Sequence, residues 1–371
     1  MIIPFIEQHA IAVITVVLVV FAGIFLLLFL YTTLHRYMLG RQIERENKTE
    51  ERLQPLIFAY LDNQLNIQEF SAHVHKRYEL MVVHRNINIM IDNLSGPERK
   101  MLQILLELPE FKKYFYKKLR SRRPMHVAQA CMYFSQKSRI DPKSIRRLSI
   151  LQQHPYNVIA YASTLALINS NNRHVRDQAL HRFLHRKQNA SMAVNDIIFK
   201  YYGKYSEKLE AAEKLVFYVM DYTIPDKTNA AVIAMFPDLG FYQYSKDLHG
   251  LLLRVIPEDR SGILTSTLIR VLHELSAEQI LPEIENYKLW ESPFTNVRLQ
   301  VAQVFSVEKE PRLTDILLQL AHDPDLEVRI IAQQALLKMD LVYLRENAFS
   351  ENILPEWEEM KRSGGEYVYS F

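Results

Sequence analysis

The feature that most constrains this chain is an unbroken apolar run, AIAVITVVLVVFAGIFLLLFLY, from Ala10 to Tyr31. A helix of this length extends about 33 Å at 1.5 Å per residue, and the hydrocarbon core of a bilayer is about 30 Å thick. No comparable run occurs elsewhere in the sequence. The sequence therefore predicts a single transmembrane helix at residues 10–31, an extracytoplasmic N-terminus at residues 1–9, and a large polar region after the span.

The basic residues predict on which side of the membrane that large region lies. Residues 1–9 contain no Lys or Arg. The basic residues that follow the run are Arg36, Arg41, Arg45, Lys48 and Arg52. Because basic flanks stay cytoplasmic, we expect a single-pass protein of the inner or plasma membrane with its N-terminus outside and its C-terminal region in the cytoplasm. A cleaved secretory signal would need a basic start, a shorter apolar core and a small-residue cleavage site, which are absent.

The region after the span has the pattern of short helices. Glycine is scarce, with 9 residues in the chain, and apolar residues recur at helical spacing between short polar breaks. Helix-start signals punctuate the pattern: Ser95 with Glu98, Ser276 with Gln279, and Asp141 and Asp323, each before a proline. The predicted fold class is all-α, with a helical connector at 32–93, helical repeats at 94–350, and a C-terminal helix with an aromatic tail at 351–371.

Three segments of the repeat region share one template, which places a Val-Arg pair near the start of a helix. DPDLEVRIIAQQAL at 323–336 and SPFTNVRLQVAQVF at 292–305 match in register with a spacing of 31 residues, and NNRHVRDQAL at 171–180 is a third copy. These segments resemble HEAT repeats, in which paired antiparallel helices stack into an α-solenoid. The resemblance implies a HEAT-like solenoid after the membrane helix, because one helix pair cannot bury its own apolar face and stacked pairs can.

The resemblance also implies a ladder of polar contacts between neighbouring repeats. In HEAT repeats an acidic or amide side chain in the turn of a repeat pairs with an arginine early in the second helix. Asp323 or Asp325 would then partner positions of the Arg329 type. The earlier rungs implied in this way are Asn296 with Arg298 and Asn172 with Arg176.

Charge is unevenly distributed along the chain, although the net charge is only +3. Residues 111–187 contain 17 Lys and Arg and only two acids, whereas residues 188–371 contain 18 basic and 28 acidic residues. A basic region joined to an acidic region creates an electrostatic field that can orient charged partners. The alternative is that these charges form a solvated surface without a function. The residues expected to bind a partner are Lys112, Lys113, Lys117, Lys118, Arg120, Arg122, Arg123, Arg146, Arg147, Arg173, Arg182 and Arg186.

Three kinds of partner fit a basic region of this size. An acidic protein surface is the preferred one. Anionic lipid is the second, since each basic residue near the cytoplasmic leaflet contributes about 1 kcal/mol. Nucleic acid is the third, because Tyr114, Phe115 and Tyr116 interleave with lysines and could stack on bases, but a membrane anchor disfavours it. An enzyme acting on nucleic acid would have to use Asp141 or Asp177, the two acids of the basic region.

No catalytic or cofactor motif occurs in the sequence: a glycine-rich phosphate loop, HExxH, GxSxG and paired cysteines are all absent. His174, Asp177, His181 and His185 form a stripe at helical spacing, but neighbouring arginines would repel a cation, so no metal site is predicted. The sequence thus predicts a non-enzymatic bacterial scaffold or accessory subunit without a cofactor or small-molecule substrate. Its expected partner is a membrane-associated protein, such as a glycosyltransferase of envelope polysaccharide.

Overall fold

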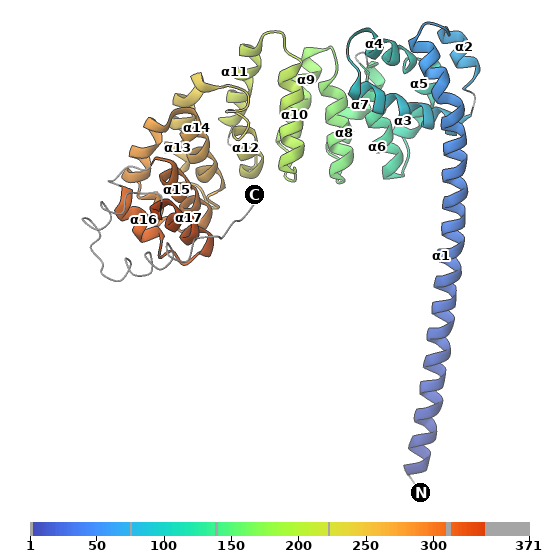
Figure 1. Cartoon of the computed structure of the whole chain (residues 1–371), viewed down its shortest axis with the longest axis horizontal. Helices are drawn as coiled ribbons and strands as arrows, with labels where there is room; N and C mark the ends of the chain where they lie inside the picture. Colours follow the sequence, from blue (N-terminus) through green and yellow to red (C-terminus); the bar gives the residue numbers. More distant parts are fainter. Residues whose placement is uncertain (1–2, 75, 138–139, 222, 309–312, 338–371) are drawn as a thin grey trace. The chain divides into compact units, whose positions relative to one another are not determined.

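The protein is all-α, as the sequence predicts. The computed structural model describes residues 3–74, 76–137, 140–221, 223–308 and 313–337, and every regular element in these ranges is a helix (Figure 1). The predicted C-terminal helix and aromatic tail at 351–371 lie outside the described residues. The helices are α1 (Ile3–Leu61), α2 (Ile67–Ala72), α3 (Arg77–Asn93), α4 (Gly96–Leu105), α5 (Pro109–Leu119), α6 (Pro124–Ser135), α7 (Pro142–Leu151), α8 (Asn157–Ile168), α9 (Arg173–Leu184), α10 (Ser191–Gly203), α11 (Lys208–Val219), α12 (Asp226–Ile233), η1 (Tyr242–Tyr244), α13 (Ser245–Val255), α14 (Ile263–Asn286), η2 (Leu289–Glu291), α15 (Thr295–Glu308), α16 (Thr314–Leu320) and α17 (Leu326–Leu337).

The apolar run and the start of the predicted connector form one continuous helix, α1, of 59 residues (Figure 1). Its large apolar side chains from Leu18 to Tyr31 are 49–75 % exposed. Further along the same helix, Leu53 and Ile57 are completely buried by neighbouring helices. By length and composition, α1 could therefore cross a membrane with its first part while its last part belongs to a folded core.

The chain packs as two units, Met1–Lys137 and Ser138–Phe371. In unit 1, α4 packs against both α1 and α3, and α5 packs against α3 and α6. The boundary between the units falls after Lys137. Helices α4 and α5 join the first unit by packing against α3, and α6 joins it by packing against α5, where the buried rings of Phe115 and Tyr133 stack with their centres 4.3 Å apart.

Unit 2 is built by packing each helix against its neighbours along the chain. Helix α8 contacts α7, α9 and α10, and the contacts continue from α10 to α12, from α12 to α14, from α14 to α15 and from α15 to α17. Helix α8 is apolar on almost every side and is buried along most of its length. Each of these helices thus shares its core with the next helices along the chain.

The structure agrees with some of the predicted helix starts and differs from others. Asp141 caps α7 by accepting a hydrogen bond from the backbone N–H of Ser144 at 3.0 Å. Ser95 precedes α4 but makes no capping hydrogen bond with its side chain. At the Asp323-Pro324 signal the capping residue is Asp325, which accepts from the N–H of Glu327 at 2.9 Å. The predicted start at Ser276 is wrong, because α14 runs through that position without a break.

Candidate functional site

The densest basic cluster of the sequence lies on α5 and the turn that follows it, in unit 1. Phe111, Phe115 and Leu119 are spaced four residues apart and are all buried, which fixes the inner face of the helix. Lys112 and Lys117 therefore lie on the outer, exposed face. The exposed residues of the predicted set in this unit are Lys112, Lys113, Lys117, Arg120, Arg122 and Arg123.

Lys118 differs from these residues because it is only half-exposed. Its ammonium donates a hydrogen bond to Oε1 of Gln129 at 2.7 Å and lies 4.6 Å from the centre of the Tyr114 ring. Burial lowers the pKa of the Lys118 ammonium below its usual range. A charge that is partly removed from water gains more from an incoming anion than a fully hydrated one.

A groove of about 880 Å³ lies beside α5 and contains basic and aromatic side chains but no carboxylate among its lining residues. Its cationic side chains come from α3, from α5 and from the turn between α5 and α6: Arg77, Lys117, Lys118, Arg120 and Arg123. Burial, Lys118 and Arg123 lower the pKa of His126 in the same groove. The groove therefore has a positive potential that disfavours a further cation.

An apolar groove of about 550 Å³ adjoins the basic one and shares four of its lining residues, Gln42, Met81, Met125 and Gln129. It continues over Ile89 and Met132. The two form one surface between α1, α3, α5 and α6, which we call the composite groove. The basic half is visible in the sequence as a charge cluster. The methionine half is not, because Met81 belongs to α3 and Met125 and Met132 belong to α6, without a common motif.

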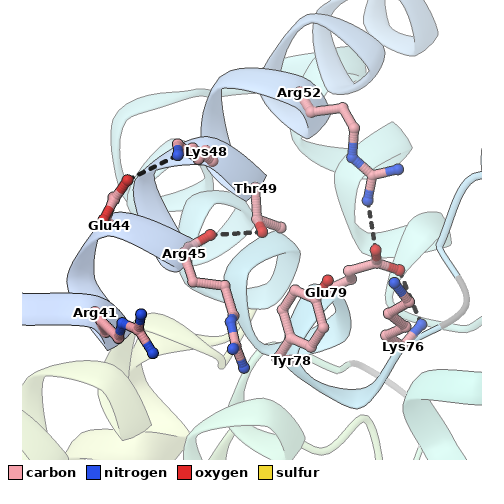
Figure 2. A pocket seen from close by; sticks show the side chains of 9 residues that line it. All are labelled: Arg41, Glu44, Arg45, Lys48, Thr49, Arg52, Lys76, Tyr78 and Glu79. Atoms are coloured by element: carbon pink, nitrogen blue, oxygen red, sulfur yellow. Dashed lines mark hydrogen bonds and ion pairs between the residues drawn. The ribbon is translucent and has the colours of Figure 1, made fainter. Parts of the chain in front are cut away.

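A third pocket, of about 570 Å³, lies between α1 and the start of α3 (Figure 2). Its cations are partly neutralised: Lys48 pairs with Glu44 at 2.7 Å, and Arg52 pairs with Glu79 at 2.5 Å. Glu79 also accepts a hydrogen bond from the backbone N–H of Lys76 at 2.8 Å, so it ties α1 to α3. The Arg52–Glu79 pair joins α1 to α3, whereas the Lys48–Glu44 pair is exposed and lies within one turn of α1. Because these carboxylates offset its cations, the pocket is a weaker candidate for ligand binding than the composite groove.

The remaining predicted partner-binding residues belong to unit 2 and differ in exposure. Arg146 and Arg182 are exposed, and Arg147 is half-buried. Arg173 forms an ion pair with Glu210, which offsets its charge. Arg186 is 8 % exposed and donates hydrogen bonds to the carbonyl of His154 at 3.0 Å and to the side chains of Asn157 and Asn189. Because its donors are used inside the fold, Arg186 offers little to a partner.

Asp177 is the centre of a polar cluster in unit 2. Its carboxylate accepts hydrogen bonds from the hydroxyl of Tyr201 at 2.8 Å, from Tyr205 and from Lys214. Burial by itself raises the pKa of Asp177, but the hydrogen bonds from Lys214 and the two tyrosines outweigh it, so the pKa lies below its usual range. Burial, and the hydrogen bonds of Tyr201 with Tyr205 and Asp177, raise the pKa of Tyr201. Asp177 thus connects α9 to α10 and α11. Its hydrogen bonds join these helices and do not position a group for a chemical reaction.

The three arginines of the ladder that the HEAT resemblance implies share one contact. The guanidinium groups of Arg176, Arg298 and Arg329 each donate to the carbonyl oxygen six residues earlier in the chain, at 3.0, 2.7 and 2.7 Å. Arg298 also forms a two-pronged ion pair with Asp323 of the next helix pair, at 2.6 and 3.0 Å. Arg176 instead lies 5.1 Å from the centre of the Tyr205 ring.

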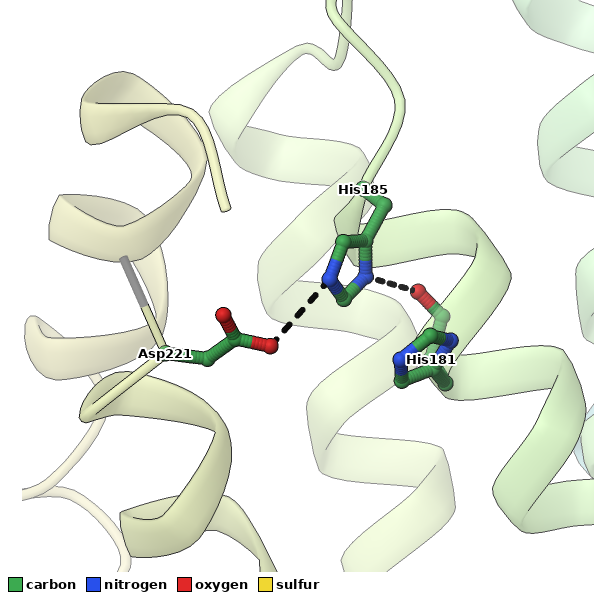
Figure 3. Close-up of side chains that lie close together, drawn as sticks. All are labelled: His181, His185 and Asp221. Carbon is green, nitrogen blue, oxygen red and sulfur yellow. Dashed lines mark hydrogen bonds and ion pairs between the residues drawn. The ribbon is translucent and has the colours of Figure 1, made fainter. Parts of the chain in front are cut away.

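The histidine stripe of α9 is joined by an acid that the sequence did not indicate, Asp221 (Figure 3). Nδ1–H of His185 donates to the carbonyl of His181 at 2.7 Å, and its Nε2 lies 3.2 Å from Oδ2 of Asp221 and 2.7 Å from the hydroxyl of Thr223. One ligand-type atom from each of His181, His185 and Asp221 lies within 4.8 Å of the other two. These three residues could hold a metal ion; in the structure they connect α9 to the segment after α11.

Comparison with known proteins adds no family to these observations. No protein-family model matches the chain, and no curated protein is significantly similar to it. The geometry of the composite groove and of the polar clusters is therefore the basis on which a function can be argued.

Proposed function

We propose that the protein is a membrane-anchored cytoplasmic scaffold whose HEAT-like helical repeats and unit 1 bind a membrane-associated protein partner. The observation that carries the proposal is the composite groove, in which several cationic side chains meet an apolar surface without a compensating carboxylate in the basic half. Helix α1 connects that groove directly to the apolar run. A partner with acidic and apolar groups complements both halves.

A binding role is favoured over catalysis by the two acids of the basic region. The carboxylate of Asp141 accepts from the N–H and the hydroxyl of Ser144, and so caps α7. Asp177 is held by two tyrosines and a lysine. An acid that acts as a general base needs a lone pair directed at substrate, and both of these acids are used within their own unit.

Anchoring to the membrane strengthens a weak contact. Two molecules confined to one membrane meet at a high effective concentration, so an interface of modest affinity can be well populated. The partner class that benefits is a protein of the same membrane, such as an enzyme of envelope polysaccharide synthesis. Soluble partners lack this advantage.

The test is co-purification of membrane proteins with the full-length protein from native membranes in mild detergent. One variant carries Arg77→Glu, Lys117→Glu, Arg120→Glu and Arg123→Glu, which reverse four exposed cations that line the basic half of the composite groove. A matched control carries the same number of reversals at exposed positions of unit 2, Lys227→Glu, Lys246→Glu, Arg260→Glu and Arg270→Glu. We expect a membrane protein that co-purifies with the wild type and the control and is depleted at least tenfold from the variant; equal recovery with all three would contradict the proposal.

The second candidate is a surface that binds anionic lipid, for which the same basic residues are the motivation. Binding to anionic lipid should weaken as the salt concentration rises, and this dependence distinguishes it from binding to a protein partner. The full-length protein in nanodiscs with and without anionic lipid would be compared for protection of Lys112 and Lys117 from an amine-reactive reagent at two salt concentrations. Protection that appears only with anionic lipid and disappears in high salt favours lipid; equal reactivity in all nanodiscs favours a protein partner.

A further inference from the structure

We infer that the composite groove binds an amphipathic helix with acidic residues beside its apolar face, supplied by the cytoplasmic segment that directly follows a membrane span of the partner. The inference rests on the proposed function and adds the location of the interface, the chemistry of the bound segment and its distance from the membrane.

The apolar half of the groove has the properties of a helix-binding surface. Met125 is 68 % exposed and Ile89 is 58 % exposed, although both border a groove that also contains Met81, Val82 and Met132. The one carboxylate among the lining residues of this half, that of Glu46, is paired with Arg85 at 3.0 Å. Unbranched methionine side chains adapt their shape to different apolar partners, and helix-in-groove recognition relies on such surfaces.

The basic half specifies the charge of the bound segment. Arg77, Lys117 and Arg120 line it, and Lys118 stands at its edge with its ammonium partly withdrawn from water. Because no carboxylate lines this half, its charge is not compensated locally. A helix that places its apolar face over the methionines would bring flanking Glu or Asp residues to these cations.

The position of the groove along α1 sets its distance from the membrane. Gln42, which lines both halves, follows Tyr31 at the end of the apolar run by 11 residues. In a helix these residues extend about 16 Å, or about 12 Å at a tilt of 40°. A helical segment of the partner reaches that height within about 11 residues of its own span.

The same distance disfavours lipid as the occupant. The polar headgroup layer of a flat bilayer adds about 5–8 Å on each side of the hydrocarbon core. Lipid headgroups would therefore end below the level of Gln42, whereas a protein segment can continue to that level. Nucleic acid would satisfy the cations but has no apolar face for the methionine half.

The test is site-specific photocrosslinking of the full-length protein in its native membranes. A photoreactive amino acid replaces Met125 in the groove, Lys112 on the outer face of α5, or the exposed Leu209 of unit 2 in separate variants. The cross-linked peptides are identified by mass spectrometry. We expect the Met125 probe to react with an acidic amphipathic segment that lies within about 20 residues of a membrane span.

Charge variants test the basic half in the same experiment. Adding Lys117→Glu and Arg120→Glu to the Met125 probe should lower the yield of this cross-link at least tenfold, whereas adding Lys227→Glu and Lys246→Glu should leave it unchanged. An unchanged yield with the first pair would overturn the assigned role of the cations.

The other outcomes separate this inference from the proposed function. Cross-links to a membrane protein from Lys112 or Leu209, with none from Met125, would overturn the groove as the interface and leave the scaffold function standing. Absence of protein cross-links from all three probes would contradict both the groove as the interface and the scaffold function. Cross-links from Met125 to lipid, nucleic acid or a second copy of the chain would overturn the stated occupant.

Discussion

At the residue scale, Gly262 is a position where one added carbon should destabilise unit 2. It precedes α14 with φ of +70°, and a Cβ atom there would lie 2.5 Å from Cβ of Phe294 and 2.6 Å from Oδ1 of Asn296. Both the backbone conformation and the close approach disfavour any side chain. We expect Gly262→Ala to lower the free energy of unfolding by about 2–4 kcal/mol, measured by urea denaturation.

A second glycine provides the control for this prediction. Gly250 lies inside α13, and a Cβ atom there would have no heavy atom within 4 Å. Gly250→Ala should stabilise the protein by up to about 1 kcal/mol, because alanine has the higher helix propensity. Similar effects of the two substitutions would mean that the turn before α14 accommodates a side chain.

His84 makes the stability of unit 1 depend on pH. Its ring lies 4.5 Å from the centre of the Phe115 ring, and its buried Nε2 has no hydrogen-bond partner. Burial, with a smaller effect of Lys118, lowers the pKa of His84 to about 3. An unfolded histidine has a pKa of about 6.5, so protons bind the unfolded state more readily and stability should fall as the pH decreases from about 6.5 toward 3, by up to about 1.4 kcal/mol per pH unit.

The buried thiol of Cys131 reports this effect within the same unit. Its reaction with dithiodipyridine, normalised to a free thiol at each pH, should accelerate in the wild type as the pH falls. His84→Leu should flatten that dependence, since the titrating group is removed. The same pH slope in both proteins would show that another group dominates.

Sequence reasoning at this scale succeeded where the contacts are local. The capping role of Asp141 depends on residues three positions away and was predicted. The burial of Arg186 depends on His154 and Asn157, about thirty positions earlier, and Asp221 meets His185 through a turn that no periodicity encodes. Contacts of that range are decided by how helices pack.

At the scale of elements, the ion pair between Arg298 and Asp323 joins α15 to the turn before α17. Their side chains are 12 % and 5 % exposed. Burial by itself raises the pKa of Asp323, but hydrogen bonds from Arg298 and from the N–H of Asp325 outweigh it and the pKa lies below its usual range. The stability this pair supplies should be present above the unfolded pKa of about 3.9 and be lost as the pH falls below the folded pKa.

Removing either partner should leave a buried charge behind. We expect Arg298→Met and Asp323→Asn each to cost about 3–5 kcal/mol in urea denaturation, and the double variant to cost clearly less than their sum. The exposed pair of Lys48 and Glu44 is the control, with an expected coupling below about 0.5 kcal/mol. Additive costs at Arg298 and Asp323 would contradict a direct interaction.

Helical periodicity predicted the element class correctly because helices such as α5 and α7 carry an apolar stripe at helical spacing. The same signals could not place the unit boundary after Lys137. That boundary depends on whether α4 to α6 pack with α3 or with the helices that follow, from α7 onward. Both arrangements would have the same local sequence pattern. The composite groove was half-predicted for the same reason: a charge cluster on α5 is visible in sequence, and the meeting of methionines from α3 and α6 is not.

At the scale of the whole molecule, α1 connects an apolar run to a folded unit without a flexible linker. Because residues 32–45 remain helical and largely exposed, the helix holds the groove of unit 1 at a defined height above the end of the run. With a flexible linker, the groove could lie at many distances from the membrane. A helical connection instead keeps the groove at one distance, so a partner would need a binding segment at that distance. Under the proposed function, the length of the exposed part of α1 would therefore decide which partners can reach the groove.

The orientation of the chain is the last prediction, and every proposal above depends on it. In a Cys131→Ser background, single cysteines would be placed at Gln8, before the apolar run, and at Lys187, an exposed residue of unit 2. With the N-terminus outside, a membrane-impermeant maleimide should label Gln8→Cys in intact cells and leave Lys187→Cys unlabelled. Permeabilised cells should label both, which controls for accessibility. Labelling of Lys187→Cys in intact cells would place the basic groove outside the cytoplasm and would end the case for a cytoplasmic partner, because the distribution of arginine and lysine around the run would then not have governed insertion.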